Sequence, residues 1–341
     1  MNTTKNLNIS LKGIGIANPD KFISSDEIEH ELRDVYHRLK LPFGRIEMQT
    51  GIKTRGVFVD KRPSTISAMA AKDLFQHFDY EPADVDLIIH ASVCRDFLEP
   101  STASVVHHLL DLRSDCFSFD LSNACLGVLS ALEVASNMIN NGSIQNALIV
   151  SGENSKPLLD QTIKTLNGDE NLTRKSIKKY FANFTIGSAG VAFLVGKAGE
   201  GIAQFGRCAS LSDTSAYDLC QGDGSTDSLV METNSEELMH KGVALAQNNW
   251  MRFNSVEKTQ FDHLICHQVG IQHQKFLYQS LELDFDKDYS SFQDYGNTGS
   301  AALPLTLALA IKNDIFNSND MISLLGIGSG LHTTMMELEW N

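Results

Sequence analysis

The sequence predicts an α/β fold built from two similar halves, and two observations support this expectation. The segment FDLSNACLGVLSALEVA, with Asn123 and Cys125, is echoed about 175 residues later by QDYGNTGSAALPLTLALA, with Asn297. Upstream of each copy, DLIIHAS with His90 is answered by HLICHQV with His267. The second observation is that short apolar runs alternate with helical patterns in both halves. A repeat near half the chain length indicates an internal duplication, with the halves facing each other across a pseudo-twofold axis.

The elements follow the same order in each half. In the first half we expect strands and helices at 86–93 (strand), 101–112 (helix), 116–122 (strand), 126–140 (helix), 147–153 (strand) and 191–196 (strand). In the second half we expect 236–253 (helix), 263–269 (strand), 272–281 (helix), 292–312 (strand to helix) and 322–328 (strand). Runs this rich in Val and Ile are typical of strands buried on both faces. No linker separates the halves, so we expect one compact unit with an N-terminal half over 1–200 and a C-terminal half over 201–341.

One segment interrupts this alternation. Residues 154–185 are polar and charged and contain NGDENLTRKSIKKY. A segment of this length is either a surface excursion or a cap over a substrate entrance, since long insertions often serve as lids.

Composition excludes several classes of function. The chain has 341 residues, with 42% hydrophobic and 21% charged residues, which is typical of a globular protein with a sizeable core. Its 28 basic and 42 acidic residues give a net charge of -14, which argues against nucleic acid or an anionic membrane surface as the main partner. The polar start MNTTKNLNIS and the lack of long apolar runs predict neither signal peptide nor membrane span, hence a cytoplasmic protein.

The cysteines and histidines do not suggest a metal site. The six cysteines form no CxxC pair, which favours reduced thiols over disulfides or zinc. The histidines other than His267 lack metal-ligand spacing, so we interpret them as structural or surface groups. They include His90, the His107–His108 pair, His263 and His273. We therefore expect no metal and no cofactor.

Cys125 is the main candidate for chemistry. It directly precedes LGVLSALEVA, so its sulfur is expected at a helix N-terminus, where the helix dipole lowers a thiol pKa. A lone buried cysteine is more often inert packing. Two partners change this interpretation: His267 follows a buried strand, and Asn297 lies in a GNTG turn that opens a helix. A cysteine, a histidine and an asparagine meeting between the halves is the arrangement that activated-cysteine catalysis needs.

The glycines near the C-terminus suit an oxyanion hole better than a nucleotide site. LLGIGSGLH places Gly326, Gly328 and Gly330 after a strand, but only eleven residues follow Gly330, too few for a dinucleotide fold. Gly13-Ile-Gly15 near the N-terminus lacks the third glycine of that fingerprint. A tight glycine turn lets a backbone N–H approach a carbonyl, so we predict an oxyanion hole formed by Gly330 and the N–H of Cys125.

Glu99 is a further candidate, in the segment RDFLEPSTAS. It precedes Pro100 at an expected junction between a loop and a helix. Taken alone, it is a carboxylate near a helix start, stabilised by the helix dipole.

These segments together resemble the thiolase superfamily, specifically its ketoacyl synthase III-like condensing enzymes. The resemblance covers essentially the whole chain, through TGIKTR (50–55), SNACLG around Cys125, HQVG at His267, YGNTGSAALP at Asn297 and the terminal GIGSGL. It implies a duplicated five-layer αβαβα fold, a homodimer, and a cysteine that an acyl thioester acylates before a carbon–carbon bond forms. By the same resemblance Cys125 is the nucleophile, His267 and Asn297 support the carbanion step, and Gly330 and Cys125 supply backbone donors.

Departures from the family pattern point to one branch. The fatty-acid-initiating synthases show Asn and Arg after the histidine, where this chain has Gly270 and Gln272, which puts a carrier-protein docking patch in doubt. An arginine common before TGI is Gln49 here, so the nucleotide end of coenzyme A would be held differently. RDFLEPSTAS, SNACLG and LLGIGSGL instead resemble the head-to-head acyl-condensing, OleA-type branch. That resemblance implies that Glu99 reaches across the dimer and removes a proton from the second acyl chain.

The resulting hypothesis is an acyltransferase that joins two acyl-CoA thioesters by Claisen condensation to a β-keto product, in lipid biosynthesis. It would use coenzyme A or carrier-protein thioesters as substrates and need no other cofactor. Three alternatives stay open at this point: a decarboxylating 3-oxoacyl synthase III that uses a malonyl thioester, a Cys/His/Asn hydrolase, and a non-catalytic subunit with the same fold. The papain-like cysteine motif is absent, which disfavours the hydrolase. Retention of Cys125, His267 and Asn297 disfavours the non-catalytic subunit.

Overall fold

Strands from both halves of the chain form one nine-stranded sheet. The computed structural model describes residues 4–223, 229–255, 258–267 and 269–341. The strands lie in the order β11-β12-β13-β8-β1-β7-β6-β4-β5. Their bounds are β1 Lys5–Ala17, β4 Leu87–His90, β5 Phe117–Asp120, β6 Asn146–Glu153, β7 Ala189–Lys197, β8 Ala203–Ser212, β11 His263–Cys266, β12 Met321–Gly328 and β13 His332–Trp340.

The two wings of this sheet repeat one pattern of strand pairing. In the first wing β4 pairs β6 in parallel, and β6–β7 and β7–β1 are antiparallel. In the second wing β11 pairs β12 in parallel, and β12–β13 and β13–β8 are antiparallel. The antiparallel pair β1–β8 joins the wings. The sequence repeat therefore corresponds to a structural repeat, as the duplication hypothesis predicts.

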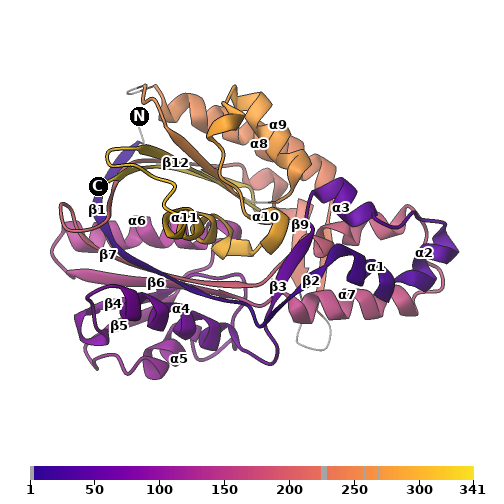
Figure 1. Cartoon of the computed structure of the whole chain (residues 1–341), viewed down its shortest axis with the longest axis horizontal. Coiled ribbons are helices and arrows are strands. Elements are labelled where there is room, and N and C mark those ends of the chain that lie inside the picture. The colour runs from indigo at the N-terminus through magenta and orange to yellow at the C-terminus, as the bar shows by residue number, and fades with distance from the viewer. Residues whose placement is uncertain (1–3, 224–228, 256–257, 268) are drawn as a thin grey trace.

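Helices form three layers around the two wings (Figure 1). α6 (Gly127–Asn140) and α11 (Ala302–Lys312) lie between the wings, while α4 (Pro63–His77) and α5 (Thr102–Leu109) cover the first wing outside. α8 (Ser235–Phe253) and α9 (Ile271–Leu281) cover the second wing. α11 reads ALPLTLALAIK and is apolar nearly all round, as a helix packed between two sheets must be. The result is the predicted αβαβα arrangement. None of the helices in the described part is long and apolar enough to cross a membrane.

A cap of smaller elements packs at one end of the sheet. It contains α1 (Ser25–Glu31), α2 (Arg33–Leu39), α3 (Arg45–Thr50), α7 (Lys156–Gly168), the 3-10 helix η3 (Ser176–Phe184) and two two-stranded antiparallel sheets, β2 (Lys21–Ser24) with β3 (Thr54–Val57) and β9 (Cys220–Asp223) with β10 (Val230–Thr233). Leu159, Ile163 and Phe184 pack against Ile28 and Leu32 in a hydrophobic cluster of their own. The 154–185 segment is therefore an ordered layer rather than a loose excursion.

Two sequence expectations about elements are wrong. Residues 292–295 form the short helix α10 (Phe292–Tyr295) rather than a strand, and the turn η6 (Gly299–Ala301) then leads into α11. The long strand β1, with Gly13 and Gly15 inside it, was not predicted. Its apolar residues do alternate, at Leu7, Ile9 and Leu11 and again at Ile14 and Ile16, so the strand signal is present in the sequence and was overlooked. The strand expected over 263–269 ends at Cys266, and Gln268 lies outside the described residues.

Candidate active site

Cys125 lies in the turn that joins an edge strand to the central helix α6. β5 ends at Asp120, and the 3-10 turn η2 (Ala124–Leu126) leads into the helix. Ala124 has a left-handed backbone with φ of 44°. This conformation is uncommon for a residue with a side chain and recurs at functional turns. The bend places Cys125 at the start of the helix, as the sequence predicts.

Burial controls the thiol of Cys125 more than the helix does. Burial raises the pKa of Cys125 to about 12, and the nearby carboxylate of Glu153 adds to the rise. The predicted lowering of this pKa is therefore wrong for the free protein, because desolvation of a thiolate outweighs the partial charge at a helix start. The thiol is protonated at neutral pH and must lose its proton when it reacts.

His267 follows the last residue of β11 and is held by the neighbouring strand. Its N–H donates to the carbonyl of Leu325 over 2.8 Å. The imidazole is buried, and burial together with nearby His273 lowers the pKa of His267 to about 3. Its Nδ1 has no hydrogen-bond partner among the residues that the structure describes. His267 is therefore a neutral imidazole with a ring nitrogen free to interact with a substrate.

Asn297 lies between α10 and η6, tied to the first wing by its backbone. Its N–H donates to the carbonyl of Thr185 over 2.8 Å, and its own carbonyl accepts the N–H of Gly187 over 2.9 Å. Its side-chain Oδ1 accepts the N–H of Gly299 over 3.1 Å. Gly296 has φ of 71°, a left-handed conformation that favours glycine. The turn thus fixes the asparagine from both sides and leaves its amide group as a donor.

The Cys125 and Asn297 segments touch each other through Ser300. Its Oγ accepts the N–H of Val128, in the first turn of α6, over 3.1 Å. A Cβ on Gly127 would lie 2.6 Å from this Oγ, so the close approach requires glycine at this position. The structure therefore brings together the segments that carry Cys125 and Asn297, which lie far apart in the sequence.

The C-terminal glycine turn also approaches Cys125. A Cβ on Gly328 would lie 3.6 Å from the backbone nitrogen of Cys125. Gly330, two residues later, has φ of 123° and would meet the ring of His332 at 2.7 Å if it carried a Cβ. The turn that follows β12 thus lies beside the catalytic candidate, and the oxyanion hole of Gly330 with Cys125 stays a prediction.

Glu99 lies apart from these groups within one subunit. It is exposed in the loop between β4 and α5. Throughout the described ranges it forms no hydrogen bond or ion pair, with Cys125, His267 and Asn297 or with any other residue. Its neighbour Leu98 is 91% exposed, and Val93 at the loop's start is 53% exposed. The loop projects its acid and its apolar side chains outward together.

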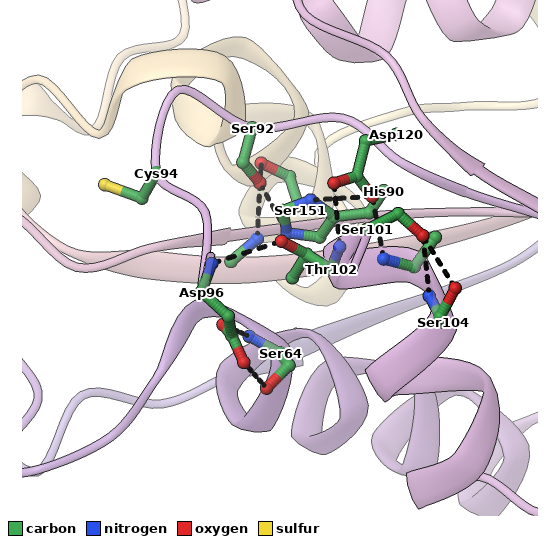
Figure 2. A network of polar contacts seen from close by, with 12 residues as sticks. Ser64, His90, Ser92, Cys94, Asp96, Ser101, Thr102, Ser104, Asp120 and Ser151 are labelled. Carbon is green, nitrogen blue, oxygen red and sulfur yellow. Dashed lines mark hydrogen bonds and ion pairs between the residues drawn. The ribbon is translucent and has the colours of Figure 1, made fainter. Parts of the chain in front are cut away.

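A buried polar network fixes the second end of this loop (Figure 2). The carboxylate of Asp120 accepts the N–H groups of Thr102 and Ala103, each over 2.7 Å, at the start of α5. The Nδ1 of His90 lies 3.9 Å from the same carboxylate, and its Nε2 lies 3.1 Å from the Oγ of Ser92. His90 is therefore a structural group, as the sequence analysis interprets it.

Glu153, at the end of β6, is a buried residue that the sequence analysis missed. One oxygen of its carboxylate accepts the N–H groups of Val93 over 2.8 Å and Ser300 over 3.0 Å, and the other accepts the N–H of Cys94 over 3.0 Å. Burial raises the pKa of Glu153, whereas these N–H groups oppose the rise. The only sequence signal was a glutamate ending the apolar run ALIVSGE, which is equally typical of a solvated strand end.

A cavity of about 700 Å³ lies within the cap, between α3 and η3 on one side and the β9–β10 strand pair on the other. Its wall combines cationic and apolar side chains from α3 and η3, among them Arg45, Lys175, Lys178, Ile177 and Phe181. Leu219 and Gln221, on either side of Cys220 in the sequence, also line it. The cavity wall carries the carboxylates of Asp218, Glu232 and Glu236 as well, so it combines charges of both signs with apolar surface.

Family models cover most of the second half and part of the first. Residues 251–340 match the model for the C-terminal part of 3-oxoacyl-(acyl-carrier-protein) synthase III, and residues 119–213 match the model for 3-oxoacyl-(acyl-carrier-protein) synthase III. Residues 53–159 match the model for FAE1/type III polyketide synthase-like protein.

Individual relatives span nearly the full chain. An acyl-CoA:acyl-CoA alkyltransferase of Shewanella oneidensis is 30% identical over 93% of this chain and 95% of its own length. An acyl-CoA:acyl-CoA alkyltransferase of Xanthomonas campestris is 28% identical over 98% of this chain and 99% of its own length. A beta-ketoacyl-(acyl-carrier-protein) synthase III of Clostridium tetani is 25% identical over 86% and 89%. The structure of cerulenin-bound OleA from X. campestris superposes with a TM-score of 0.92, 28% identity and coverage of 98% and 97%.

Proposed function

Because this chain belongs to the ketoacyl synthase III-like condensing enzymes of the thiolase superfamily, we propose that it joins two acyl-CoA thioesters by head-to-head Claisen condensation. The observation that carries this proposal is the packing of the Cys125 turn against the Asn297 turn and the terminal glycine turn. The names of the Shewanella oneidensis and Xanthomonas campestris relatives, both acyl-CoA:acyl-CoA alkyltransferases, support the acyl-CoA reaction over the malonyl one.

The first step is acylation of Cys125. Its sulfur attacks the carbonyl carbon of an acyl-CoA, and the thiol proton leaves with the thiolate of coenzyme A. Because the thiol of Cys125 is protonated in the free protein, its proton must leave as the sulfur attacks, and it ends on the thiolate of the departing coenzyme A. Backbone N–H groups of Cys125 and Gly330 would hold the oxygen that becomes negative.

The second step forms the carbon–carbon bond. A base removes an α-proton from a second acyl-CoA, the enolate carbon attacks the acyl-Cys125 carbonyl, and the sulfur of Cys125 leaves. Hydrogen bonds from His267 and Asn297 would stabilise the enolate oxygen. Glu99 is the proposed base. A simple acyl-CoA has no carboxyl group on its α-carbon, so it cannot form the carbanion by losing carbon dioxide and must lose a proton instead.

Glu99 would act in the site of the partner subunit of a homodimer. Three observations support this arrangement: Glu99 makes no polar contact within its own described chain, Leu98 beside it is 91% exposed, and Phe117 on the edge strand β5 is 58% exposed. Exposed apolar side chains beside an unpaired sheet edge are typical of an interface. A second copy that covers this face would bring Glu99 to the neighbouring Cys125.

The cavity at the cap would admit the substrate. Arg45, Lys175 and Lys178 in its wall suit phosphate groups, although Asp218, Glu232 and Glu236 line the same cavity. We therefore favour coenzyme A over an acidic carrier protein as the acyl carrier, with no further cofactor. The six free cysteines support a cytoplasmic location.

Intact mass tests the proposal in both steps. Incubation of the wild type with one long-chain acyl-CoA should add one acyl mass on the Cys125 peptide, and Cys125→Ser should abolish that mass. Glu99→Gln should keep acylation while condensation falls by on the order of 100-fold, the effect of losing a general base. Product formed only with a malonyl thioester would favour the decarboxylating synthase instead.

Mixed dimers test the reach of Glu99 across the interface. When Glu99→Ala subunits are mixed with Cys125→Ala subunits, one site of each mixed dimer keeps both an intact Cys125 and an intact Glu99 from the other subunit. Condensation should return in the mixture, although each variant alone is inactive. No recovery after subunit exchange, verified by native mass spectrometry, would place Glu99 outside the partner's site.

A further inference from the structure

The carboxylate of Glu153 joins two segments of the proposed site at one buried point. Its Oε1 accepts the N–H of Val93 over 2.8 Å and that of Ser300 over 3.0 Å. Its Oε2 accepts the N–H of Cys94 over 3.0 Å. Val93 and Cys94 begin the loop of Glu99, whereas Ser300 ends the turn of Asn297. One side chain, 3% exposed, therefore fixes both segments at once.

A third segment is connected through Ser300. The N–H of Ser300 donates to Glu153, and its Oγ accepts the N–H of Val128 over 3.1 Å. Val128 lies in the helical turn directly after Cys125. The chain of contacts therefore runs from the Glu153 carboxylate through Ser300 to the segment that holds the nucleophile.

We propose that Glu153 is a positioning residue that holds the Cys125, Asn297 and Glu99 segments in register for both steps of the reaction. This inference rests on the proposed function. The carboxylate fixes the Glu99 loop and the Asn297 turn directly through three N–H donors, and the Cys125 segment indirectly through Ser300. Without it these N–H groups would lose their acceptor in a buried site. Small displacements of reacting groups cost large factors in rate.

Two other carboxylates of the chain provide matched comparisons. Asp96 accepts the N–H of Ser64 over 2.9 Å and its Oγ over 2.6 Å, so it anchors the Glu99 loop without contacting the Asn297 turn. Asp86 accepts the N–H groups of Gln145 over 2.8 Å and Asn146 over 3.1 Å, where β6 begins. Asp86 thus serves the start of the strand that Glu153 ends, at the end of β6 away from the site.

The experiment compares Glu153→Gln, Glu153→Ala, Asp96→Asn and Asp86→Asn. Acylation is timed by intact mass with a long-chain acyl-CoA, and condensation is timed in a single turnover of protein already acylated on Cys125. We expect Glu153→Gln to slow both steps about tenfold and Glu153→Ala on the order of 100-fold. Asp96→Asn should slow condensation alone, and Asp86→Asn should lower the melting temperature without changing either rate.

A third readout does not depend on acyl chemistry. Alkylation of Cys125 by iodoacetamide should be several-fold faster in both Glu153 variants than in Asp86→Asn, because a negative charge beside the thiol is removed. Glu153 variants that match Asp86→Asn in all three readouts, or that slow condensation alone as Asp96→Asn does, would overturn the inference. A wild type that acyl-CoA does not acylate would contradict the proposed function, while the alkylation comparison would still show whether the Glu153 carboxylate acts on Cys125.

Discussion

His90 and His267 occupy corresponding places in the two halves, yet their surroundings differ. His90 ends β4 and His267 directly follows β11, and each of these strands pairs in parallel with a neighbour, β6 and β12 respectively. Both are buried, and burial lowers the pKa of His90 to about 4 and that of His267 to about 3. His90 has Ser92 and Asp120 as polar neighbours, whereas Nδ1 of His267 has no partner within the described residues.

This difference shows how a duplicated fold separates structure from chemistry. In the first half the histidine is part of a buried network that holds the Glu99 loop. In the second half the same position keeps a ring nitrogen free, which costs stability unless a substrate or water satisfies it. A buried polar atom without a partner is thus the feature that distinguishes the candidate catalytic histidine from its structural counterpart.

The largest expected effect is on the condensation step. His267→Ala should lower condensation by on the order of 1000-fold, because the enolate oxygen loses a positioned donor. His90→Ala should lower it less than tenfold, through a looser Glu99 loop. Single-turnover assays on protein already acylated at Cys125 measure both. Equal losses in the two variants would remove the functional distinction between the histidines.

Acid stability should depend on both histidines. Their pKa values in the folded protein lie below the ordinary value of 6.5, so protonation favours the unfolded chain. The stability that they contribute as neutral groups is complete above pH 6.5 and is lost as pH falls toward about 4 for His90. His90→Asn should reduce the acid-induced loss of unfolding free energy by up to about 3 kcal/mol. The pKa of His90 falls from 6.5 to about 4, and one pKa unit corresponds to about 1.4 kcal/mol. Urea unfolding between pH 7 and pH 4.5 measures the slope, and an unchanged slope would contradict it.

For stability at neutral pH the ranking of the two histidines should be the opposite of their ranking for condensation, with the larger effect at His90. His90→Asn should lower the free energy of unfolding by about 2 kcal/mol, because Ser92 and Asp120 lose a buried partner. His267→Asn should lower it by under about 1 kcal/mol, because no bond to its Nδ1 is lost. Chemical unfolding at pH 7.5 measures both values. A larger loss for His267→Asn would mean that this histidine is a structural group as well.

The sequence predicts the fold well because the repeat and the Val-rich and Ile-rich runs directly report buried strands. It also identifies Cys125, His267 and Asn297, since their neighbouring residues are distinctive, although their roles stay proposals. It fails where tertiary contacts decide. The Cys125 pKa depends on burial that no local pattern encodes, and Glu153 bonds to backbone N–H groups far away in the sequence, which only the folded chain brings together.

A further small effect is expected from one hydroxyl group in the first half. The Oγ of Ser92 lies 3.1 Å from Nε2 of His90 and 3.1 Å from Oγ of Ser151, and accepts the N–H of Gly152 over 2.9 Å. Ser92→Ala removes all three contacts and leaves a ring nitrogen of His90 free, which makes it resemble His267. We expect a loss of about 1 kcal/mol of unfolding free energy and an unchanged rate of Cys125 acylation.

Ser151→Ala is the matched control for this change, because it removes only the contact between the two hydroxyls and leaves the bond of Ser92 to His90 in place. It should cost less than Ser92→Ala when both are measured by urea unfolding at pH 7.5. Equal losses would mean that the histidine gains nothing from the serine. The contrast between a partnered His90 and a free His267 would then have to rest on the contact of His90 with Asp120 alone.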